Sequence, residues 1–561
     1  MRSTRASFDI RIERLTVVTL TALWLLMIPL INPIGDFPLN DDWAYGQTVY
    51  HLVTSGSWSM ERWFEPSLVA QALWGALFCL PFGFSFTALR LSTLVLGLIG
   101  LLSTYVLLRR ATPSHLLAGL GVLLVAVNPL YLSLSYTFMT DVPFYAMATL
   151  AVVLFVWGIE SDNGRLLVLG MLLSCLATLT RQIGIVIPFA CAIAYLARYG
   201  LSARTIRRAV AWCAPVLLLL LAYQVLRDST FGAAVNGPSR VSQTLLLLED
   251  PLSGAGALIG RRSSAILVYV GLFLLPLLFV VGAGQWLHAS RRARVGLLLT
   301  TGFLAAALVA GLVYTGHSMP ILQNVLYDIG LGPASLRDAL VLKTRSLPHA
   351  PPGAWTAITV VAGVAGAILL VFAIAVIVRV FERLRREHSL TGEWFTVLAL
   401  AINLFYFMPL ATGQVYFDRY VLLHLPLVMI LIVGVIGPRI TVPRWAAAAA
   451  AALIIPIAAF SIAATHDYLS WNRARWNALD DLVKVQGISP HAIDGGFEFN
   501  GWYLYDPNYK EKPGKSWWWV DGDEYIVAFG PIPAYSQIRS YRYDRWLPPG
   551  QGHVAVLKKR S

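Results

Sequence analysis

Residues 15–47 read LTVVTLTALWLLMIPLINPIGDFPLNDDWAYGQ, a long apolar run followed by a short polar segment with two adjacent acids. The apolar run, Leu15–Ile31, follows an arginine-rich start and has no A-x-A cleavage site after it. This pattern predicts an uncleaved membrane span rather than a signal peptide. The arginines before the run predict a cytoplasmic N-terminus, so Asp41 and Asp42 should lie on the extracytoplasmic side.

The composition is that of a membrane protein. Of 561 residues, 57% are hydrophobic and 13% are charged, whereas soluble globular proteins carry about 25% charged residues. The net charge of +13 does not indicate nucleic acid, because the basic residues recur in short loops between apolar segments. The four cysteines lie in apolar stretches without CxxC spacing, which indicates packing rather than a zinc site or a disulfide framework.

Thirteen apolar segments are expected to cross the membrane, since basic residues lie on the inner side of nearly every turn between them. The apolar segment Leu68–Pro81 is shorter than the roughly 20 residues that a spanning helix needs, so we expect a helix lying at the outer surface. The expected spans are 15–31, 87–108, 116–134, 142–157, 166–179, 183–197, 209–226, 265–286, 297–314, 357–378, 395–410, 421–436 and 446–464.

The composition changes after residue 464. A helix is expected at Trp471–Val485, followed by short strands separated by glycine and proline turns. The predicted fold class is therefore an all-α polytopic membrane domain, residues 1–464, followed by a small extracytoplasmic α/β domain, residues 465–561. The expected strands are Ala492–Phe499, Tyr525–Phe529, Gln537–Tyr541 and His553–Leu557.

The acidic pair Asp41-Asp42 has two interpretations. Asn40 is a good N-cap, and a short helix from Asp41 to Leu52 would place both acids in its first turn, roughly 100° apart. The acids would then merely complement the positive end of the helix. Alternatively, two carboxylates among aromatic residues at the mouth of a membrane protein are typical of a site that activates a hydroxyl or holds a cation.

Further polar motifs lie on the same outer face. They are Ser135–Pro143, Thr180-Arg181-Gln182 and Gln414–Tyr420. Asp141, in the first of these motifs, could serve the first turn of the next helix as a purely structural residue. Arg181 and Arg419 could anchor helix ends among lipid headgroups, or their guanidinium groups could bind a phosphate through paired hydrogen bonds.

Taken in order, four motifs resemble the GT-C membrane glycosyltransferases, the superfamily of dolichyl-phosphate-mannose protein mannosyltransferases and aminoarabinose transferases. They are Asp41-Asp42, MTDVPF at residues 139–144, TRQ at 180–182 and FDRY at 417–420. The resemblance covers about residues 10–440. It implies a multi-pass enzyme of the plasma (inner) membrane that moves a hexose or pentose from a polyprenyl-phosphate donor. The acceptor would be a lipid, a glycan or a protein at the outer face.

The family's pattern makes Asp41 the leading candidate for the general base, with Asp42 as its neighbour and Asp141 as a second acid. The family more often has Asp-Glu at this pair, so the sequence leaves the choice of carboxylate open. A divalent cation (Mg²⁺ or Mn²⁺) at Asp41 and Asp42 also stays open, because hard cations favour carboxylates. Cations are needed to stabilise the departing phosphate, a role open to Arg181, Arg419, Arg90 and Arg62. Substrate contacts are expected from Tyr45, Tyr136, Gln182, His317, Asn324 and Tyr420.

The competing hypothesis is a transporter or flippase for a lipid-linked glycan. Such a protein is expected to carry ionisable residues near the middle of the membrane and to show related halves. Here the predicted spans are nearly free of acids, and the charged residues gather at their ends. The absence of a G-x-x-x-x-G-K-[ST] motif argues against direct use of ATP. The sequence therefore favours an enzyme that works at the membrane surface.

Overall fold

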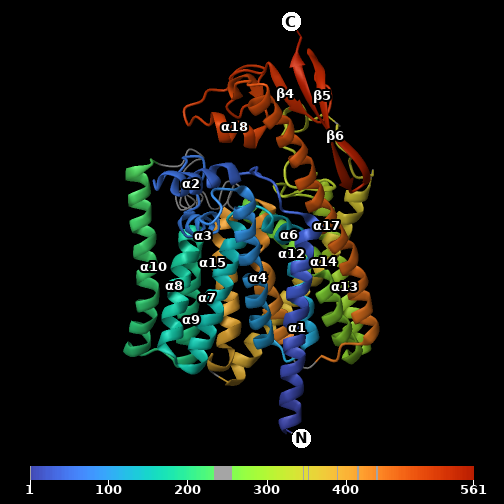
Figure 1. Cartoon of the computed structure of the whole chain (residues 1–561). Coiled ribbons are helices and arrows are strands. Elements are labelled where there is room, and N and C mark those ends of the chain that lie inside the picture. The colour runs from blue at the N-terminus through green and yellow to red at the C-terminus, as the bar shows by residue number, and fades with distance from the viewer. Residues whose placement is uncertain are drawn as a thin grey trace.

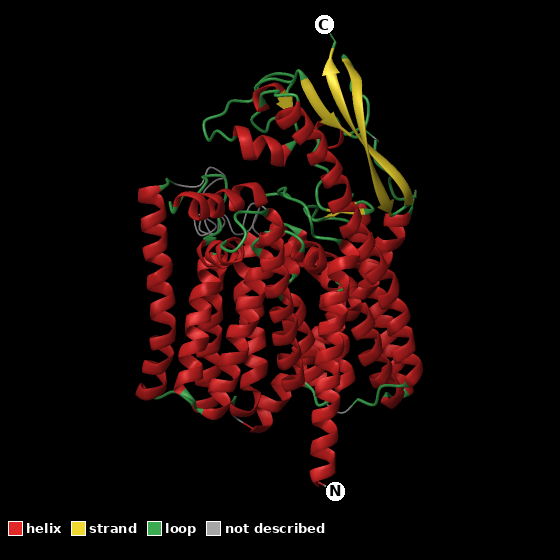
Figure 2. Ribbon diagram, in the orientation of Figure 1, coloured by secondary structure: helices red, strands yellow, loops and turns green. Residues whose placement is uncertain are grey.

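Long helices stand side by side in a bundle, and a smaller part with a β-sheet covers one end (Figures 1 and 2). We call this end the upper end of the bundle; the N-terminus lies at the opposite, lower end (Figure 1). The computed structural model describes residues 2–232, 256–344, 346–351, 353–387, 390–412, 416–436 and 440–560. Of the motif Gln414–Tyr420, Gln414 and Val415 lie outside the described residues.

Within these ranges, eleven helices are long and apolar enough to cross a membrane, or twelve if one bent pair counts as a single span. The fold is thus a polytopic helical bundle, as the apolar runs predict. Its main helices are α1 (Arg2–Ile31), α4 (Phe86–Ala111), α5 (His115–Ala126), α6 (Pro129–Ser135), α7 (Asp141–Ser161), α8 (Gly164–Thr180), α9 (Val186–Tyr199), α10 (Ala203–Thr230), α12 (Gly256–His288), α13 (Arg291–Tyr314), α14 (Ala354–Glu387), α15 (Trp394–Thr412), α16 (His424–Leu431) and α17 (Arg444–Asp480).

Thirteen spans were expected and eleven are found in the described part of the chain, because two of the expected segments do not form a single long helix. The run Leu116–Leu134 is broken into α5 and α6, which meet at an angle of 59°, because Asn128 caps α6 and Pro129 opens it. Helix α8 has only 17 residues, about 25 Å at the α-helical rise. It still runs antiparallel to α7 at similar height, since Arg181 at its upper end contacts Asp141 at the upper end of α7.

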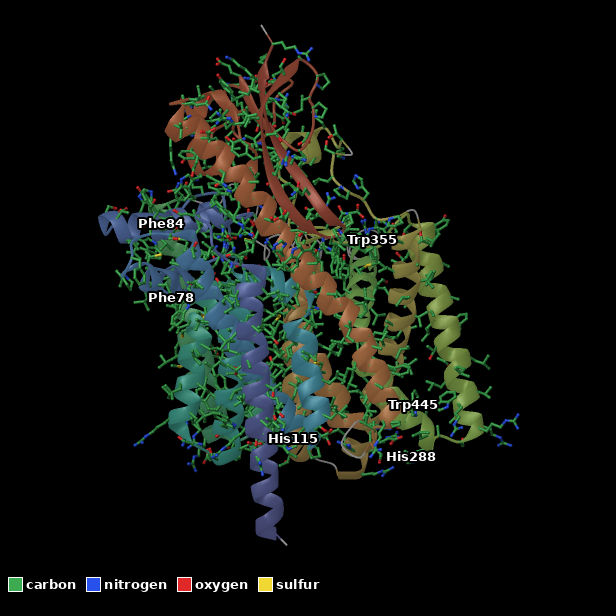
Figure 3. All side chains as sticks on the ribbon, turned by 45° about the vertical axis from the view of Figure 1, so that its right-hand side comes forward. Phe78, Phe84, His115, His288, Trp355 and Trp445 are labelled. Atoms are coloured by element: carbon green, nitrogen blue, oxygen red, sulfur yellow. The ribbon has the colours of Figure 1, made fainter. Side chains whose placement is uncertain are left out.

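Short helices lie at the upper end of the bundle (Figure 1). Helix α3 (Val69–Cys79) has 11 residues and lies at this end, so the segment Leu68–Pro81 forms a short helix rather than a span. In Figure 3, Phe78, Phe84 and Trp355 lie toward this end, whereas His115, His288 and Trp445 lie toward the lower end. Helix α2 (Asp42–Ser55), with 14 residues, also lies at the upper end.

The start of α2 differs from the prediction. Asp41, not Asn40, occupies the N-cap position, and Asn40 has a φ of 55°. Asparagine tolerates this left-handed conformation better than most residues. The backbone N–H of Asn40 donates instead to Glu498, which lies in the C-terminal part of the chain.

The last spanning helix continues into the C-terminal part without a break. α17 runs from Arg444 to Asp480, and one π-helical turn, η7 (Asp481–Val485), extends it. The helix expected at Trp471–Val485 is therefore the upper part of this span. Since the composition changes along a continuous helix, the division into residues 1–464 and 465–561 remains a proposal.

A four-stranded sheet forms the top of the molecule (Figure 2). Its order is β3-β4-β6-β5, with β3 parallel to β4 and the other pairs antiparallel. The expected strand Ala492–Phe499 is wrong beyond its first residues, because Gly496 has a φ of 88° and ends the extended segment. The elements are β3 (Ile493–Asp494), α18 (Phe497–Leu504), β4 (Tyr525–Ala528), β5 (Tyr535–Trp546) and β6 (Pro549–Lys559).

The connection between α13 and α14 also lies at the upper end. It contains a small hairpin, β1 (Leu326–Tyr327) and β2 (Gly330–Leu331), followed by the π-helical turn η3 (Arg337–Val341). We call residues 317–353 the α13–α14 loop. It reaches both the bundle and the C-terminal part, since Leu322 bonds to Tyr269 of α12 and Ser335 bonds to Glu498 of α18.

Candidate functional site

Asp41 lies at the start of α2 and faces two other segments. Its Oδ1 accepts a hydrogen bond of 3.1 Å from Nε1 of Trp63, and its Oδ2 lies 3.9 Å from Nη2 of Arg419. The side chain is 20% exposed. Burial raises the pKa of Asp41 above its usual value, while Arg419 and Trp63 oppose that rise. An accessible carboxylate with a raised pKa suits a general base.

Asp141 joins two arginines at the first turn of α7. Its Oδ1 accepts a hydrogen bond from Nη1 of Arg181, and its Oδ2 lies 3.8 Å from Nε of Arg419. Arg181 follows α8, and Arg419 lies in η5 (Asp418–Val421), just before α16. The ends of four helices, α2, α7, α8 and α16, thus bring together Asp41, Asp141, Arg181 and Arg419, which we call the charge cluster.

Arg419 keeps hydrogen-bonding capacity in this cluster. Its Nε and Nη1 atoms are buried and donate no hydrogen bond to any other residue that the structure describes. Beside it, the guanidinium of Arg181 lies 5.0 Å from the ring of Tyr420, and that of Arg419 lies 5.7 Å from the same ring. Two neighbouring guanidinium groups, one with unused donors, are suited to the oxygens of a phosphate.

Asp42 lies apart from the charge cluster. It is fully buried, and its Oδ2 accepts a hydrogen bond of 2.9 Å from the backbone N–H of Phe138. Burial raises the pKa of Asp42 to about 8, so its carboxyl is mostly protonated at neutral pH. A protonated acid cannot accept a proton, and the contact shows instead that Asp42 attaches α2 to the turn between α6 and α7.

Asp418 holds Arg419 in place. Its fully buried carboxylate accepts backbone hydrogen bonds from Leu326 at 2.7 Å, Val325 at 3.0 Å, Asn324 at 3.4 Å and Arg419 itself at 2.7 Å. Such a set of N–H donors stabilises a buried negative charge. The α13–α14 loop is thereby attached to the segment that carries Arg419.

Two of the residues expected to bind the donor or substrate lie elsewhere. The guanidinium of Arg90 donates to the carbonyl oxygens of Pro33, Gly35 and Phe37. It therefore shapes the connection between α1 and α2. Tyr136 donates to the carbonyl of Met27 at 2.8 Å inside the bundle. Neither residue reaches the charge cluster.

Three other expected residues lie on α2, after Arg181 and between α2 and α3. Tyr45, on α2, packs against Phe64 with ring centroids 5.1 Å apart, and burial raises its pKa, as does the nearby charge of Asp41. Gln182 donates to the carbonyl of Glu65 at 2.5 Å and so supports the segment between α2 and α3. Arg62, in that same segment, lies close to Gly232.

His317 and Asn324 belong to the α13–α14 loop. Nδ1 of His317 and Oδ1 of Asn324 are buried and have no hydrogen-bond partner among the described residues. Asn324 is tied to the site through its backbone, which donates to Asp418. These side chains therefore remain proposals for substrate contact.

The sequence did not single out Trp63, although it contacts the leading candidate base. Its indole also belongs to an aromatic cluster that joins α2 to the C-terminal part. Trp43 lies 5.2 Å from Trp519 and 5.2 Å from Tyr505, and Trp63 lies 5.0 Å from Trp519. The only signal in the sequence was the unusual density of aromatic residues in both segments.

The residues present do not fit a divalent cation between Asp41 and Asp42. Both oxygens of Asp41 face Trp63 and Arg419, whereas Asp42 turns toward Phe138. Across the described part of the chain, no group of three or more His, Cys, Asp or Glu side chains is arranged to hold a metal. Mg²⁺ needs several converging oxygens, and these two acids do not supply them.

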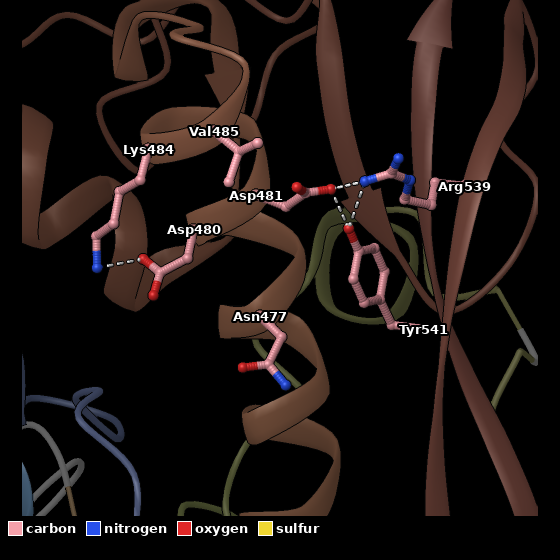
Figure 4. Close-up of a pocket in the computed structure, with 7 residues that line it drawn as sticks. All are labelled: Asn477, Asp480, Asp481, Lys484, Val485, Arg539 and Tyr541. Carbon is pink, nitrogen blue, oxygen red and sulfur yellow. Dashed lines mark hydrogen bonds and ion pairs between the residues drawn. The ribbon is translucent and has the colours of Figure 1, made fainter.

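A separate hollow lies in the C-terminal part, between the upper end of α17 and β5 (Figure 4). Asp481 accepts hydrogen bonds there from Tyr541 and Arg539, and Lys484 pairs with Asp480 at 2.9 Å. The hollow shares no residue with the charge cluster. Its acids are already paired, so it adds nothing to the chemistry of the charge cluster.

Residues 66–226 match the family described as dolichyl-phosphate-mannose-protein mannosyltransferase. The chain has no match among curated protein sequences.

Among solved structures, the chain is similar to AglB of Archaeoglobus fulgidus in complex with an inhibitory peptide and a dolichol-phosphate. The identity is 14%, the TM-score 0.44, and the match covers 90% of this chain and 62% of that one. The oligosaccharyltransferase of the same organism, tethered with an acceptor peptide, has 15% identity, a TM-score of 0.40 and coverages of 84% and 58%. The chain thus spans about three fifths of the length of these two proteins. ArnT of Cupriavidus metallidurans, bound to undecaprenyl phosphate, has 13% identity, a TM-score of 0.38 and coverages of 97% and 97%.

Proposed function

We propose that the chain is a membrane glycosyltransferase of the GT-C type that transfers a sugar from a polyprenyl-phosphate carrier, since residues 66–226 match the family described as dolichyl-phosphate-mannose-protein mannosyltransferase. The matched family is named for a dolichyl-phosphate sugar donor. The acceptor would be a hydroxyl or phosphate of a lipid, glycan or protein. The observation that carries the proposal is the position of Arg419 between Asp41 and Asp141, with two donors unused.

In the proposed reaction, Asp41 accepts the proton of an acceptor hydroxyl while the hydroxyl oxygen forms a bond to the anomeric carbon. The bond between that carbon and the phosphate oxygen breaks, and its electron pair stays on the leaving polyprenyl phosphate. Arg419 and Arg181 neutralise the charge that develops on this phosphate. Asp141 takes no proton, since its role is to hold both guanidinium groups in place.

The three acids thereby receive different roles. Asp41 is the base because it is partly exposed and borders the guanidinium that would bind the phosphate. Asp42 suits this role less well, because burial raises its pKa to about 8 and its side chain is fully buried. Asp141 has one oxygen bound to Arg181 and the other facing Arg419, so protonating it would weaken both ion pairs.

We propose further that the upper end of the bundle lies outside the cytoplasm, in the plasma (inner) membrane. Basic residues gather at the lower end, where α4 ends with Arg109 and Arg110 and α14 ends with Arg385 and Arg386. An excess of arginine and lysine is typical of cytoplasmic loops.

The proposal is tested by incubating membranes that contain the protein with radiolabelled polyprenyl-phosphate hexoses and pentoses. We expect one donor to be consumed, with free polyprenyl phosphate released and the label moved into lipid, glycan or protein. Membranes from cells without the protein serve as the control. If the labelled donor instead crosses the membrane intact, the transporter hypothesis is favoured and the transferase is ruled out for that donor.

A further inference from the structure

Glu498, on α18, is a buried carboxylate that joins three distant segments. Its Oε1 accepts a hydrogen bond of 3.0 Å from the backbone N–H of Asn40. Its Oε2 accepts one of 2.7 Å from Nη1 of Arg475 and another from the hydroxyl of Ser335. Glu498 is fully buried, as is Arg475. The C-terminal part of the chain therefore makes direct polar contact with the residue that precedes the candidate base.

The contact with Glu498 holds Asn40 at a backbone position of unusual conformation. Its φ of 55° lies in the left-handed region, which few residues with a side chain other than asparagine and aspartate adopt. Asp41 follows immediately, and its carbonyl accepts the first hydrogen bonds of α2, from Ala44 at 3.0 Å and Tyr45 at 3.3 Å. The Asn40–Glu498 bond thus fixes the backbone at the point where the side chain of Asp41 leaves it.

The α13–α14 loop holds the other side of the site. Ser335 contacts Glu498 through its hydroxyl, and its carbonyl accepts the N–H of Phe497 at 3.0 Å. Earlier in the same loop, the backbone of residues 324–326 binds Asp418, beside Arg419. Two buried carboxylates, Glu498 and Asp418, therefore connect one loop to Asn40, which precedes Asp41, and to Arg419.

Further contacts near Asn40 hold α18 against α2. The side chain of Gln47 donates to the carbonyl of Trp502 at 3.0 Å. A methyl group on Gly501 would lie 2.5 Å from the ring of Trp43, so α18 and α2 approach closely. Burial is the main cause of the raised pKa of Asp41, and the negative charge of Glu498 adds to it.

We propose that Glu498 is a positioning residue for the reaction: through Asn40, the C-terminal part of the chain sets the distance between Asp41 and Arg419. The site is then complete only when α18 is seated on α2. This inference rests on the proposed function for its catalytic consequence, whereas its structural part can be measured without any substrate.

The structural part is tested by hydrogen–deuterium exchange on Glu498→Gln. The glutamine amide would present donors to Arg475 or Asn40 in place of an acceptor oxygen. The matched control is Asp494→Asn, a buried acid of the same part, which bonds to Asn500, Ser516 and Trp518 rather than to α2. We expect faster exchange at residues 38–46 in Glu498→Gln but not in Asp494→Asn. Equal exchange in both variants would overturn the inference, whatever the enzyme's activity.

The catalytic part is tested by the pH dependence of kcat/KM for sugar transfer. Glu498→Gln should lower kcat/KM on the order of 10²-fold, the loss expected from a small displacement of a catalytic group. The acidic limb of the pH profile of kcat/KM should also move to lower pH in this variant, because the substitution removes a negative charge that raises the pKa of Asp41. Glu498→Asp keeps the charge opposite Arg475, so it guards against a variant that does not fold. We expect it to be intermediate in rate and to keep the position of the acidic limb.

The outcomes separate the two proposals. Faster exchange in Glu498→Gln, with no sugar transfer by any form of the protein, would retain the positioning of Asp41 and contradict the proposed function. Normal transfer kinetics and an unshifted acidic limb in both Glu498 variants would contradict the positioning role and retain the proposed function.

Discussion

Nη2 of Arg419 lies 3.9 Å from Oδ2 of Asp41, although the two residues are far apart in the sequence. The same guanidinium faces Asp141 with its Nε at 3.8 Å. A group suited to the leaving phosphate and a group suited to the acceptor's proton are therefore neighbours. This arrangement supports a reaction in which both partners meet at the ends of α2, α7 and α16.

Arg419→Lys should weaken donor binding about 10- to 100-fold, since a charge-assisted hydrogen bond contributes about 1.5–3 kcal/mol. Lysine keeps the charge but cannot reproduce the planar fork of a guanidinium. Thermal-shift titration with a polyprenyl phosphate measures the affinity. Arg473→Lys is the control, because Arg473 donates only to the carbonyls of Asn32 and Ile34 among the described residues. Equal affinity in the Arg419 and Arg473 variants would mean that the phosphate is held elsewhere.

Asp42→Asn should reduce the dependence of stability on pH. The pKa of Asp42 is about 8 in the folded protein, compared with 3.8 for an ordinary aspartate. The folded form binds this proton more tightly, so the stabilisation is complete below about pH 4 and is lost as the pH rises through 8. Thermal unfolding in detergent between pH 5 and pH 9 measures the slope. Asp521→Asn, at an exposed position, should keep the wild-type slope. An unchanged slope in Asp42→Asn would contradict the raised pKa assigned to Asp42.

Trp63→Phe should move the acidic limb of the transfer reaction to higher pH. The hydrogen bond from Trp63 lowers the pKa of Asp41, and phenylalanine removes that bond while keeping an aromatic ring. Since the base must be ionised to act, a higher pKa requires a higher pH. Trp517→Phe is the matched control, because Trp517 stacks on Trp63 with centroids 6.3 Å apart. An acidic limb at the same pH in Trp63→Phe and the wild type would show that Trp63 does not affect the pKa of the base.

Reporter fusions should show which end of the bundle lies in the cytoplasm. Fusions after Arg110, Arg208, Arg294 and Arg386 should report cytoplasm, whereas fusions near Asp42, near His317 and at the C-terminus should report the opposite side. The physical reason is the concentration of arginines at the lower end. A cytoplasmic C-terminus would invert the proposed orientation and would place the charge cluster on the cytoplasmic side.

The spans could be predicted because each requires a long apolar run, and such runs are visible in the sequence. The break between α5 and α6 had a local signal in Asn128-Pro129, which caps and opens a helix. No local signal in the sequence predicted that α17 continues past residue 464. The fall in hydropathy there shows that the helix leaves apolar surroundings, but it does not show whether the helix ends. The upper part of α17 packs against β5 and β6, and these tertiary contacts accompany the extra length of the helix.

The candidate site was predictable in part. Asp41, Asp141, Arg181 and Arg419 lie at helix ends at the upper end of the bundle, as the alternating direction of the predicted spans implies. Their partners were not predictable, since Glu498 and Trp63 meet the start of α2 only through tertiary packing. The different environments of Asp41 and Asp42 likewise depend on burial and on Phe138, which adjacent positions in a sequence do not reveal.

The role of Asp41 as the general base is measured by comparing Asp41→Asn with Asp42→Asn in the sugar-transfer assay. Asparagine keeps the shape of the side chain but cannot take a proton at neutral pH. Asp41→Asn should lose transfer by about 10²–10⁴-fold, the usual contribution of a general base, and should still bind the polyprenyl-phosphate donor. Asp42→Asn should retain most of the transfer activity. Near-normal transfer by Asp41→Asn, or an equally large loss in Asp42→Asn, would contradict the assignment of Asp41 as the base.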